Sequence, residues 1–326
     1  MDVKKYLGNP LQLYGVEEYR LQGGKGDGMR LMRVRNGKGI DLTICPDRCA
    51  DISELYFDGC RINYTSPNGY VSPQYFQVTP NTNGFLNNWY CGLITSCGFD
   101  NIGVPNTDGE NVYGLHGTLG NIPANHIYYE VKEDRIEIHA EISDERIFGR
   151  KFLMKRLITV SLEENFVSID DVVENTGDTE DVIMVLYHIQ AGYPLLSETA
   201  QFSVNSCRVT PRDDHAAEDL DTWNKILTPT ANFQEQCYYH EFDGEKACAS
   251  LANPSIGKKL TVSFDPSQFP YMTEWKMMGE REYVLGMEPC TNTLEGRTEV
   301  GKKGNLKTLK PGERACYSVR FDLERI

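Results

Sequence analysis

The sequence lacks a long apolar run, an excess of basic charge and any low-complexity tail. No stretch approaches the roughly eighteen uninterrupted apolar residues typical of a membrane-spanning helix. Residues 1–10 also lack the apolar core of a signal peptide. We therefore expect a cytoplasmic protein that does not insert into a membrane.

Basic residues are outnumbered, with 33 Lys and Arg against 47 Asp and Glu and a formal net charge of −14. The averaged field repels nucleic acid and anionic membranes, so neither is an expected partner. A neutral or cationic small molecule suits this charge better, although acidity can also serve solubility alone.

Paired metal-binding or redox motifs are missing as well. The ten cysteines are spread over 326 residues without a C-x-x-C pair, and no two histidines are spaced as H-x-H or H-x₃-H. We therefore expect reduced and mostly buried thiols, no metal and no organic cofactor.

Long amphipathic helices are almost absent, with short candidates only at residues 3–7 and 220–227. Period-two alternation dominates instead, as in residues 135–142, where apolar and polar side chains take opposite faces. Strands are predicted at residues 40–44, 135–142, 166–173, 182–187, 260–264, 283–287 and 315–323. Without a linker or a short repeat, this pattern favours an all-β fold, a large antiparallel β-sandwich that forms one domain over residues 1–326.

Two long loops are expected, at residues 63–90 and 98–113, and loops of such length are often functional. The first is rich in aromatic residues, which are Tyr64, Tyr70, Tyr75, Phe76, Phe85, Trp89 and Tyr90. These rings could stack on sugars and close over a ligand, or they could pin the loop to the sheet, and the sequence leaves both open.

Three segments place a proton-handling side chain beside a Gly or Pro at the predicted edge of an apolar strand. His188 follows the apolar residues 182–187, Glu288 follows residues 283–287, and His116 lies between two glycines. Each has a structural alternative, as a hydrogen-bonded histidine, a paired carboxylate or an exposed loop residue. Together they supply two imidazoles and a carboxylate, the groups that acid/base catalysis uses near neutral pH.

These segments, Leu115-His116-Gly117, Tyr187-His188 with Gly192-Tyr193-Pro194, and Leu285-Gly286-Met287-Glu288-Pro289, resemble in this order the aldose 1-epimerase (galactose mutarotase-like) superfamily. The sequence is most similar to the uncharacterised DUF4432-like branch, which it resembles in Ser96-Cys97-Gly98, in Pro123-Ala124 after His116-Gly117, and in Asn292 after Glu288-Pro289. The resemblance spans residues 39–321.

The resemblance implies the supersandwich fold of galactose mutarotase-like proteins, with a sugar bound on one concave sheet. It also implies roles, with Glu288 as general base, His188 as general acid and His116 as a donor to the ring oxygen or a neighbouring hydroxyl. Such a pair opens a hemiacetal, because the anomeric hydroxyl loses a proton while the ring oxygen gains one.

The sequence departs from the superfamily in the residues that would read the hydroxyls. Mutarotases of free hexoses resemble one another in an arginine ahead of the first histidine, and here Arg48 is the candidate replacement, with an ion pair to a neighbouring aspartate as the alternative. Asp214 is the nearest candidate for the sugar-binding aspartate. Asn292, Trp275 and Gln190 are further candidates for contact with the substrate.

The leading hypothesis is thus a sugar isomerase that interconverts the anomers of an aldose or a modified sugar. Epimerisation at carbon, a metal site built from two histidines and a glutamate, and a non-catalytic carbohydrate sensor remain alternatives. The oligomeric state stays open, with a homodimer as one option.

Overall fold

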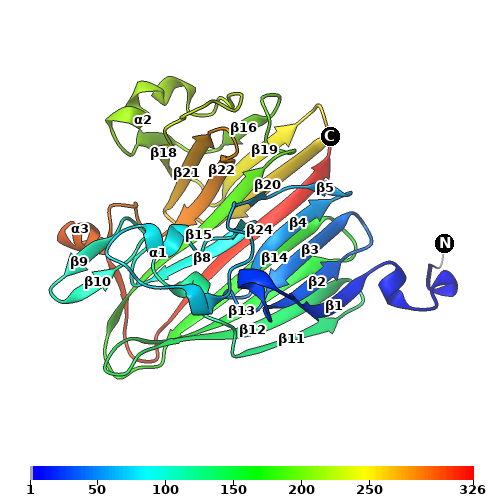
Figure 1. Ribbon diagram of the computed structural model, residues 1–326, viewed down its shortest axis with the longest axis horizontal. Helices are drawn as coiled ribbons and strands as arrows, with labels where there is room; N and C mark the ends of the chain where they lie inside the picture. The colour runs from blue at the N-terminus through cyan, green and yellow to red at the C-terminus, as the bar shows by residue number, and fades with distance from the viewer. Residues whose placement is uncertain (1–2) are drawn as a thin grey trace.

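The protein consists almost entirely of antiparallel strands, and its computed structural model describes residues 3–326 (Figure 1). The first sheet contains, in spatial order, β1 (Gly15–Arg20), β2 (Arg30–Arg35), β3 (Ile40–Cys45), β4 (Asp51–Phe57) and β5 (Cys60–Arg61). The second contains β11 (His126–Val131), β12 (Arg135–Glu145), β13 (Lys151–Ser161), β14 (Phe166–Asn175), β24 (Arg314–Arg325), β20 (Lys258–Phe264), β19 (Ala247–Asn253) and β16 (Gln201–Val204).

The third sheet carries the residues of the candidate site. Its order is β17 (Arg208–Pro211), β18 (Gln236–Glu241), β21 (Tyr271–Met278), β22 (Tyr283–Cys290), β15 (Asp181–Gly192) and β23 (Lys307–Leu309), and β8 (Ile94–Phe99) also pairs with β15. Two small hairpins are β6 (Tyr64–Thr65) with β7 (Cys91–Gly92), and β9 (Asn106–Asp108) with β10 (Asn111–Tyr113). The all-β prediction is confirmed.

Helices are short. The α-helices are α1 (Asn83–Leu86), α2 (Asp214–Glu218) and α3 (Arg297–Lys302), and the 3₁₀ turns are η1 (Val3–Tyr6), η2 (Pro10–Gln12), η3 (Gly24–Gly26), η4 (Pro73–Tyr75), η5 (Leu119–Asn121) and η6 (Leu220–Thr222). Within the described residues, no helix has the length and apolar character needed to cross a bilayer. Figure 1 places α1, α3 and the β9–β10 hairpin together on one side of the molecule, opposite the N-terminus.

The core forms where the apolar faces of the sheets meet. Alternation in β12 buries Ile136, Ile138 and Ile142, as its period-two pattern predicts. These residues share one hydrophobic cluster with Leu42 of the first sheet and Leu285 of the third. The strand β22 is buried along its whole length, so polar groups on it are isolated from water.

A buried ion-pair network joins all three sheets. Arg156 on β13 contacts Asp51 on β4 and Asp171 on β14, each at 2.7 Å between nitrogen and carboxylate oxygen. Ser96 on β8 donates its hydroxyl to Asp51 at 2.6 Å. Because each carboxylate meets a guanidinium, the burial of these charges is compensated.

The strands that carry the site are longer than the sequence predicted. β15 continues past His188 to Gly192, and β22 continues through Glu288 to Cys290, so neither side chain lies at a strand end. Gly192 marks a close approach rather than a bend, because a Cβ there would lie 2.7 Å from the Cα of Tyr64.

Candidate active site

His188 and Glu288 lie opposite each other in the third sheet, between two stretches where β15 and β22 pair. His188 Nδ1 is 2.8 Å from Glu288 Oε1. The two residues are only 4% and 1% exposed, respectively. A carboxylate so deeply buried is costly unless a proton or a charge compensates it, yet Glu288 Oε1 makes no hydrogen bond to the described residues despite this contact.

A glycine makes room for the carboxyl group of Glu288. Gly286 lies two residues earlier on the same face of β22, and a Cβ at Gly286 would lie 2.2 Å from Glu288 Oε1 and 2.9 Å from the Cβ of Trp275. Only glycine leaves space for the carboxyl group against the strand. Gly286 therefore determines where Glu288 can meet His188.

Gln190 contacts the same ring nitrogen of His188 as Glu288 does. Its Nε2 donates to the backbone carbonyl of His188 and contacts His188 Nδ1. Gln190 is 0% exposed. It therefore touches the candidate acid rather than the space open to a ligand.

His116 lies in the turn after β10, with a left-handed backbone at φ 57°. The Nδ1 atom of His116 is 2.7 Å from the carbonyl oxygen of Ile102. The backbone N–H of Gly98 donates to the carbonyl oxygen of His116 at 3.1 Å. The ring of His116 is 5.1 Å from that of His188, centroid to centroid, at 83°. The two imidazoles are thus side by side on one wall.

Aromatic rings enclose the two histidines. Trp89 packs 4.5 Å from the ring of His188, Trp275 lies 5.4 Å from the same ring, and Phe85 lies 4.8 Å from the ring of His116. Phe85 belongs to α1 and Trp89 follows it, so the long aromatic segment folds over the sheet at this point.

These side chains line a cavity of about 390 Å³. The residues around it are Thr82, Phe85, Leu86, Trp89, Gly103, Val104, Leu115, His116, His188, Arg212, Glu235, Cys237, Trp275, Glu288 and Leu294. The volume and the mixture of apolar walls with a few polar groups are typical of a small-molecule site. The structure brings His116, His188, Glu288 and Trp275 together here, as the sequence hypothesis requires.

Arg212 and Glu235 form a charged corner that sequence reasoning missed. Both guanidinium Nη atoms lie 3.4 Å from Glu235 Oε1, and Arg212 Nε donates to Asp213 at 3.1 Å. Trp275 Nε1 donates to Glu235 Oε2 at 2.8 Å. Arg212 is close in sequence to Asp214, which was the predicted ligand. The segment predicted to contact the substrate therefore does line the cavity, but with Arg212 instead of Asp214.

Burial disfavours the charged form of all three proton-handling groups. It lowers the pKa of His188 to about 3. Burial, reinforced by the neighbouring His188, lowers the pKa of His116 to about 4. Burial also raises the pKa of Glu288 well above its ordinary value, only partly opposed by His116.

A family model described as a domain of unknown function, DUF4432, matches residues 26–323. The chain belongs to the DUF4432 family. Among solved structures, a candidate aldose 1-epimerase from Klebsiella pneumoniae is 26% identical with a TM-score of 0.91, over 97% of this chain and 86% of that one.

More distant structures share the fold of this DUF4432 protein. A galactose mutarotase-like protein from Clostridium acetobutylicum is 15% identical with a TM-score of 0.69, over 97% of this chain and 100% of that one. A galactose 1-epimerase from Lactobacillus acidophilus is 11% identical with a TM-score of 0.61, over 96% and 99%. A comparison with curated proteins gives no match.

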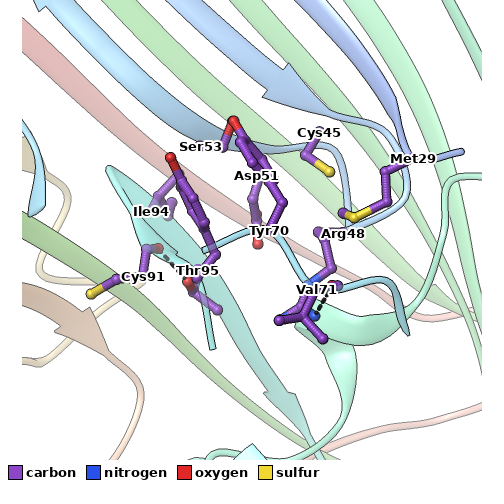
Figure 2. A pocket seen from close by; sticks show the side chains of 12 residues that line it. Met29, Cys45, Arg48, Asp51, Ser53, Tyr70, Val71, Cys91, Ile94 and Thr95 are labelled. Carbon is purple, nitrogen blue, oxygen red and sulfur yellow. Dashed lines mark hydrogen bonds between the residues drawn. The ribbon is translucent and has the colours of Figure 1, made fainter. Parts of the chain in front are cut away.

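Arg48, expected to read substrate hydroxyls, does not line the cavity of the DUF4432 site. It lines a separate, small cavity of about 20 Å³, where its Nη1 donates to the carbonyl of Val71 at 3.1 Å (Figure 2). Space of that size holds about one water molecule and no sugar ring. A salt bridge to a neighbouring aspartate, the other expectation, is not present within residues 3–326 either.

Two other expected substrate ligands also lie outside the lining. Asp214 is exposed in the first turn of α2 and does not belong to the described residues that line the cavity. Asn292 is buried but donates to the carbonyl of Asn305 at 2.8 Å and accepts from Thr291. Its amide therefore anchors the chain after β22.

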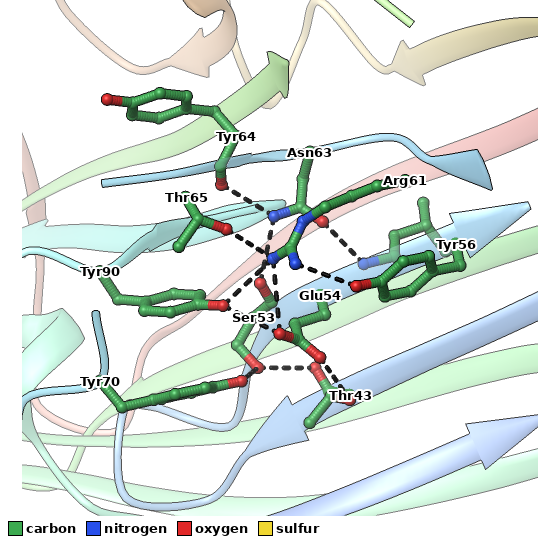
Figure 3. A network of polar contacts seen from close by, with 11 residues as sticks. Thr43, Ser53, Glu54, Tyr56, Arg61, Asn63, Tyr64, Thr65, Tyr70 and Tyr90 are labelled. Carbon is green, nitrogen blue, oxygen red and sulfur yellow. Dashed lines mark hydrogen bonds and ion pairs between the residues drawn. The ribbon is translucent and has the colours of Figure 1, made fainter. Parts of the chain in front are cut away.

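The aromatic residues of segment 63–90 have two different roles: some attach the segment to a sheet, and others line the cavity. Tyr70 and Tyr90 stack at 4.2 Å, and Tyr90 donates to Glu54 at 3.1 Å. Figure 3 shows this network, in which Arg61 also contacts Tyr90 and Glu54. These tyrosines pin the segment to the first sheet, whereas Phe85 and Trp89 line the cavity.

A convergent group of potential metal ligands occurs elsewhere on the described chain. The ligand atoms of Glu130, Glu137 and His139 lie within 4.8 Å of one another on β11 and β12. Lys132 already contacts Glu130 at 2.6 Å and Glu137 at 3.3 Å. A cation there would compete with this ammonium group.

Proposed function

We propose that this DUF4432 protein is a mutarotase-like sugar isomerase, which opens a cyclic aldose and lets it reclose as the other anomer. The main support is the arrangement of His188, which contacts Glu288 at 2.8 Å and lies beside His116 in a cavity of about 390 Å³ with aromatic walls. The likeness to the Klebsiella protein, described as a candidate aldose 1-epimerase, supports the same chemistry.

Ring opening needs one proton delivered to the ring oxygen and one removed from the anomeric hydroxyl. His188 is the acid in this proposal, because its Nδ1 is engaged by Glu288 and Gln190 while its Nε2 remains for the substrate. The base is either Glu288, as the family resemblance implies, or His116. Trp275 and Trp89 offer flat faces for the C–H groups of a sugar.

The charged side chains that line the cavity favour binding of an uncharged sugar. Among the described residues that line the cavity, Arg212 is the only cation, and Asp213 and Glu235 already neutralise it at 3.1 and 3.4 Å. A uronate, phosphate or sulfonate would therefore find no free cation and would face Glu235.

Anomer exchange measured by NMR across neutral aldoses, uronic acids and phosphorylated sugars tests the function. The proposal expects at least one neutral aldose to exchange well above the buffer rate, and the variants His188→Asn and Glu288→Gln to lose that acceleration. If no sugar exchanges faster than in buffer, or if both variants retain the full rate, the proposal fails.

The same experiment in D₂O separates ring opening from epimerisation at carbon. Ring opening leaves every carbon-bound hydrogen in place, whereas carbon epimerisation introduces deuterium next to the carbonyl. A sugar that raises the melting temperature without any exchange would instead indicate a non-catalytic binding protein.

A further inference from the structure

The lining of the cavity is polar at one end and apolar at the other. Apart from the three proton-handling residues, its hydrogen-bonding side chains are Thr82, Arg212, Glu235 and Cys237. Three of these meet at the charged corner, where Arg212 Nη1 is 3.1 Å from the sulfur of Cys237 and 3.4 Å from Glu235 Oε1. Thr82 instead precedes α1, in the segment that folds over the sheet. Hydrogen-bonding capacity is therefore concentrated at the charged corner.

This corner can still bind a hydroxyl group although its ion pair is formed. Glu235 Oε1 accepts from Arg212 and Oε2 accepts from Trp275 at 2.8 Å, and each oxygen keeps a second lone pair. A guanidinium has five N–H donors, and the contacts of Arg212 with Asp213, Glu235 and Cys237 leave one of them free. The corner therefore offers both a donor and acceptors to a sugar hydroxyl.

The opposite end of the lining, which we call the apolar wall, consists of Val104, Leu115 and Leu294. The backbone N–H of Val104 donates to the carbonyl of Leu294 at 3.0 Å, so these two residues are adjacent. The carbonyl of Val104 accepts from the side-chain amide of Asn106 at 3.0 Å. The N–H of Leu294 donates to the hydroxyl of Tyr239 at 3.2 Å. Because their backbone groups are already hydrogen-bonded, Val104 and Leu294 present carbon atoms to a ligand.

The candidate acid and base lie between these two ends. Trp275, which donates to the charged corner, pairs with Gly286, two residues before Glu288 on β22. Leu294 follows the C-terminal end of the same strand. A ligand at His188 therefore has the charged corner on one side and the apolar wall on the other.

A cyclic sugar whose reacting edge meets His188 places one of its flanks on each side. Ring opening breaks the bond between the ring oxygen and the anomeric carbon. The carbons that flank this bond are C5, which bears the hydroxymethyl group of a hexose, and C2, which bears a hydroxyl group. A hydroxyl group at the apolar wall would give up hydrogen bonds to water without gaining a partner from Val104 or Leu294.

We propose that the substrate is a deoxyaldose, in which the hydroxyl group of one flank, on C6 or on C2, is replaced by hydrogen. This inference rests on the proposed function and names the class of neutral sugar that the cavity selects. The methyl or methylene group contacts the apolar wall, while the hydroxyl groups of the other flank bind the charged corner. Val104 is 45% exposed, so water still reaches part of the wall. The preference is therefore about 10-fold in kcat/KM, rather than the roughly 100-fold of a closed apolar pocket.

Sugars that differ by a single hydroxyl group test the proposal. D-Galactose is compared with its 6-deoxy and 2-deoxy forms, and D-glucose with its own, by NMR anomer exchange after subtraction of the rate in buffer. We expect one deoxy position, the same in both series, to raise kcat/KM about 10-fold over the parent sugar. Parent sugars that react as fast as both deoxy forms, or faster, would overturn the proposal.

Val104→Thr is the matched variant, because it adds a hydroxyl group to the apolar wall in a side chain of nearly the same shape. It should lower the preference for the deoxy sugar by about 3-fold or more. Val112→Thr is the control, since Val112 on β10 is 44% exposed and is not among the described residues that line the cavity. Unchanged selectivity in a folded Val104→Thr protein would contradict the role of the apolar wall.

Binding measured without turnover separates this inference from the proposed function. Trp89 and Trp275 line the cavity, so tryptophan fluorescence reports the binding of each sugar. We expect Kd to be about 3-fold or more lower for the preferred deoxy sugar than for its parent. If this preference is found without anomer exchange, the proposed function alone fails. If the parent and deoxy sugars exchange and bind equally well, the substrate class is wrong and the isomerase function stands.

Discussion

Replacing Gly286 with alanine tests whether the contact between Glu288 and His188 drives catalysis. The new Cβ would lie 2.2 Å from Glu288 Oε1, whereas ordinary contact begins at 3.4 Å. The carboxyl group must therefore retreat by about 1 Å, and the 2.8 Å contact with His188 Nδ1 is lost. A misplacement of this size costs roughly 100-fold in rate, equivalent to about 2.7 kcal/mol in the activation free energy.

The assay is NMR anomer exchange with the best neutral aldose, analysed for kcat and KM separately. We expect kcat to fall about 100-fold in Gly286→Ala with little change in KM. Gly244→Ala is the control, because its Cβ would meet only Lys246 backbone atoms at 3.9 and 4.0 Å. If Gly286→Ala folds normally and retains the wild-type kcat, the carboxyl contact has no catalytic part and the reasoning is wrong.

Three further predictions concern stability and binding. Arg156→Met should lower the free energy of unfolding by about 3–5 kcal/mol in urea titrations, because Asp51 loses its buried partner. The folded pKa of His188 is about 3, below its unfolded value near 6.5, so stability from this group is present above pH 6.5 and lost as pH falls. His188→Asn should therefore remove a slope of about 1.4 kcal/mol per pH unit between pH 6.5 and 4, measured against wild type. Trp275→Phe, which loses the hydrogen bond to Glu235, should raise KM about 3–10-fold with kcat retained; unchanged KM would count against a sugar stacked there.

The fold class could be predicted from the sequence because period-two alternation is a local property. Residues 135–142 alternate and form part of β12, and the predicted strand at residues 260–264 lies within β20. The ends of β15 and β22 could not be predicted in this way. Gly192 and Gly286 normally suggest a turn, and only the tertiary structure reveals that each glycine accommodates another part of the molecule.

The residues of the candidate site could be predicted where they are flanked by a recognisable sequence motif. His116 and His188 are flanked by motifs that resemble a known family, and both line the cavity. Arg212 and Glu235 had no such signal, because an arginine next to Asp213 reads as a surface ion pair. Arg48 was a candidate because it stands beside a predicted turn at the end of a strand. That local context does not determine which cavity the side chain enters, and Arg48 lines a different one.

The proposed chemistry depends on packing as much as on the groups that exchange protons. Burial lowers the pKa of His188 and raises that of Glu288, because β15 and β22 are buried on both faces and Trp89 covers the imidazole at 4.5 Å. Water admitted to this wall would favour the charged forms of Glu288 and His116 and so reduce both pKa shifts. In the proposed function, the apolar shell and the segment containing Trp89 would therefore set the protonation of the groups that exchange protons, without exchanging one themselves.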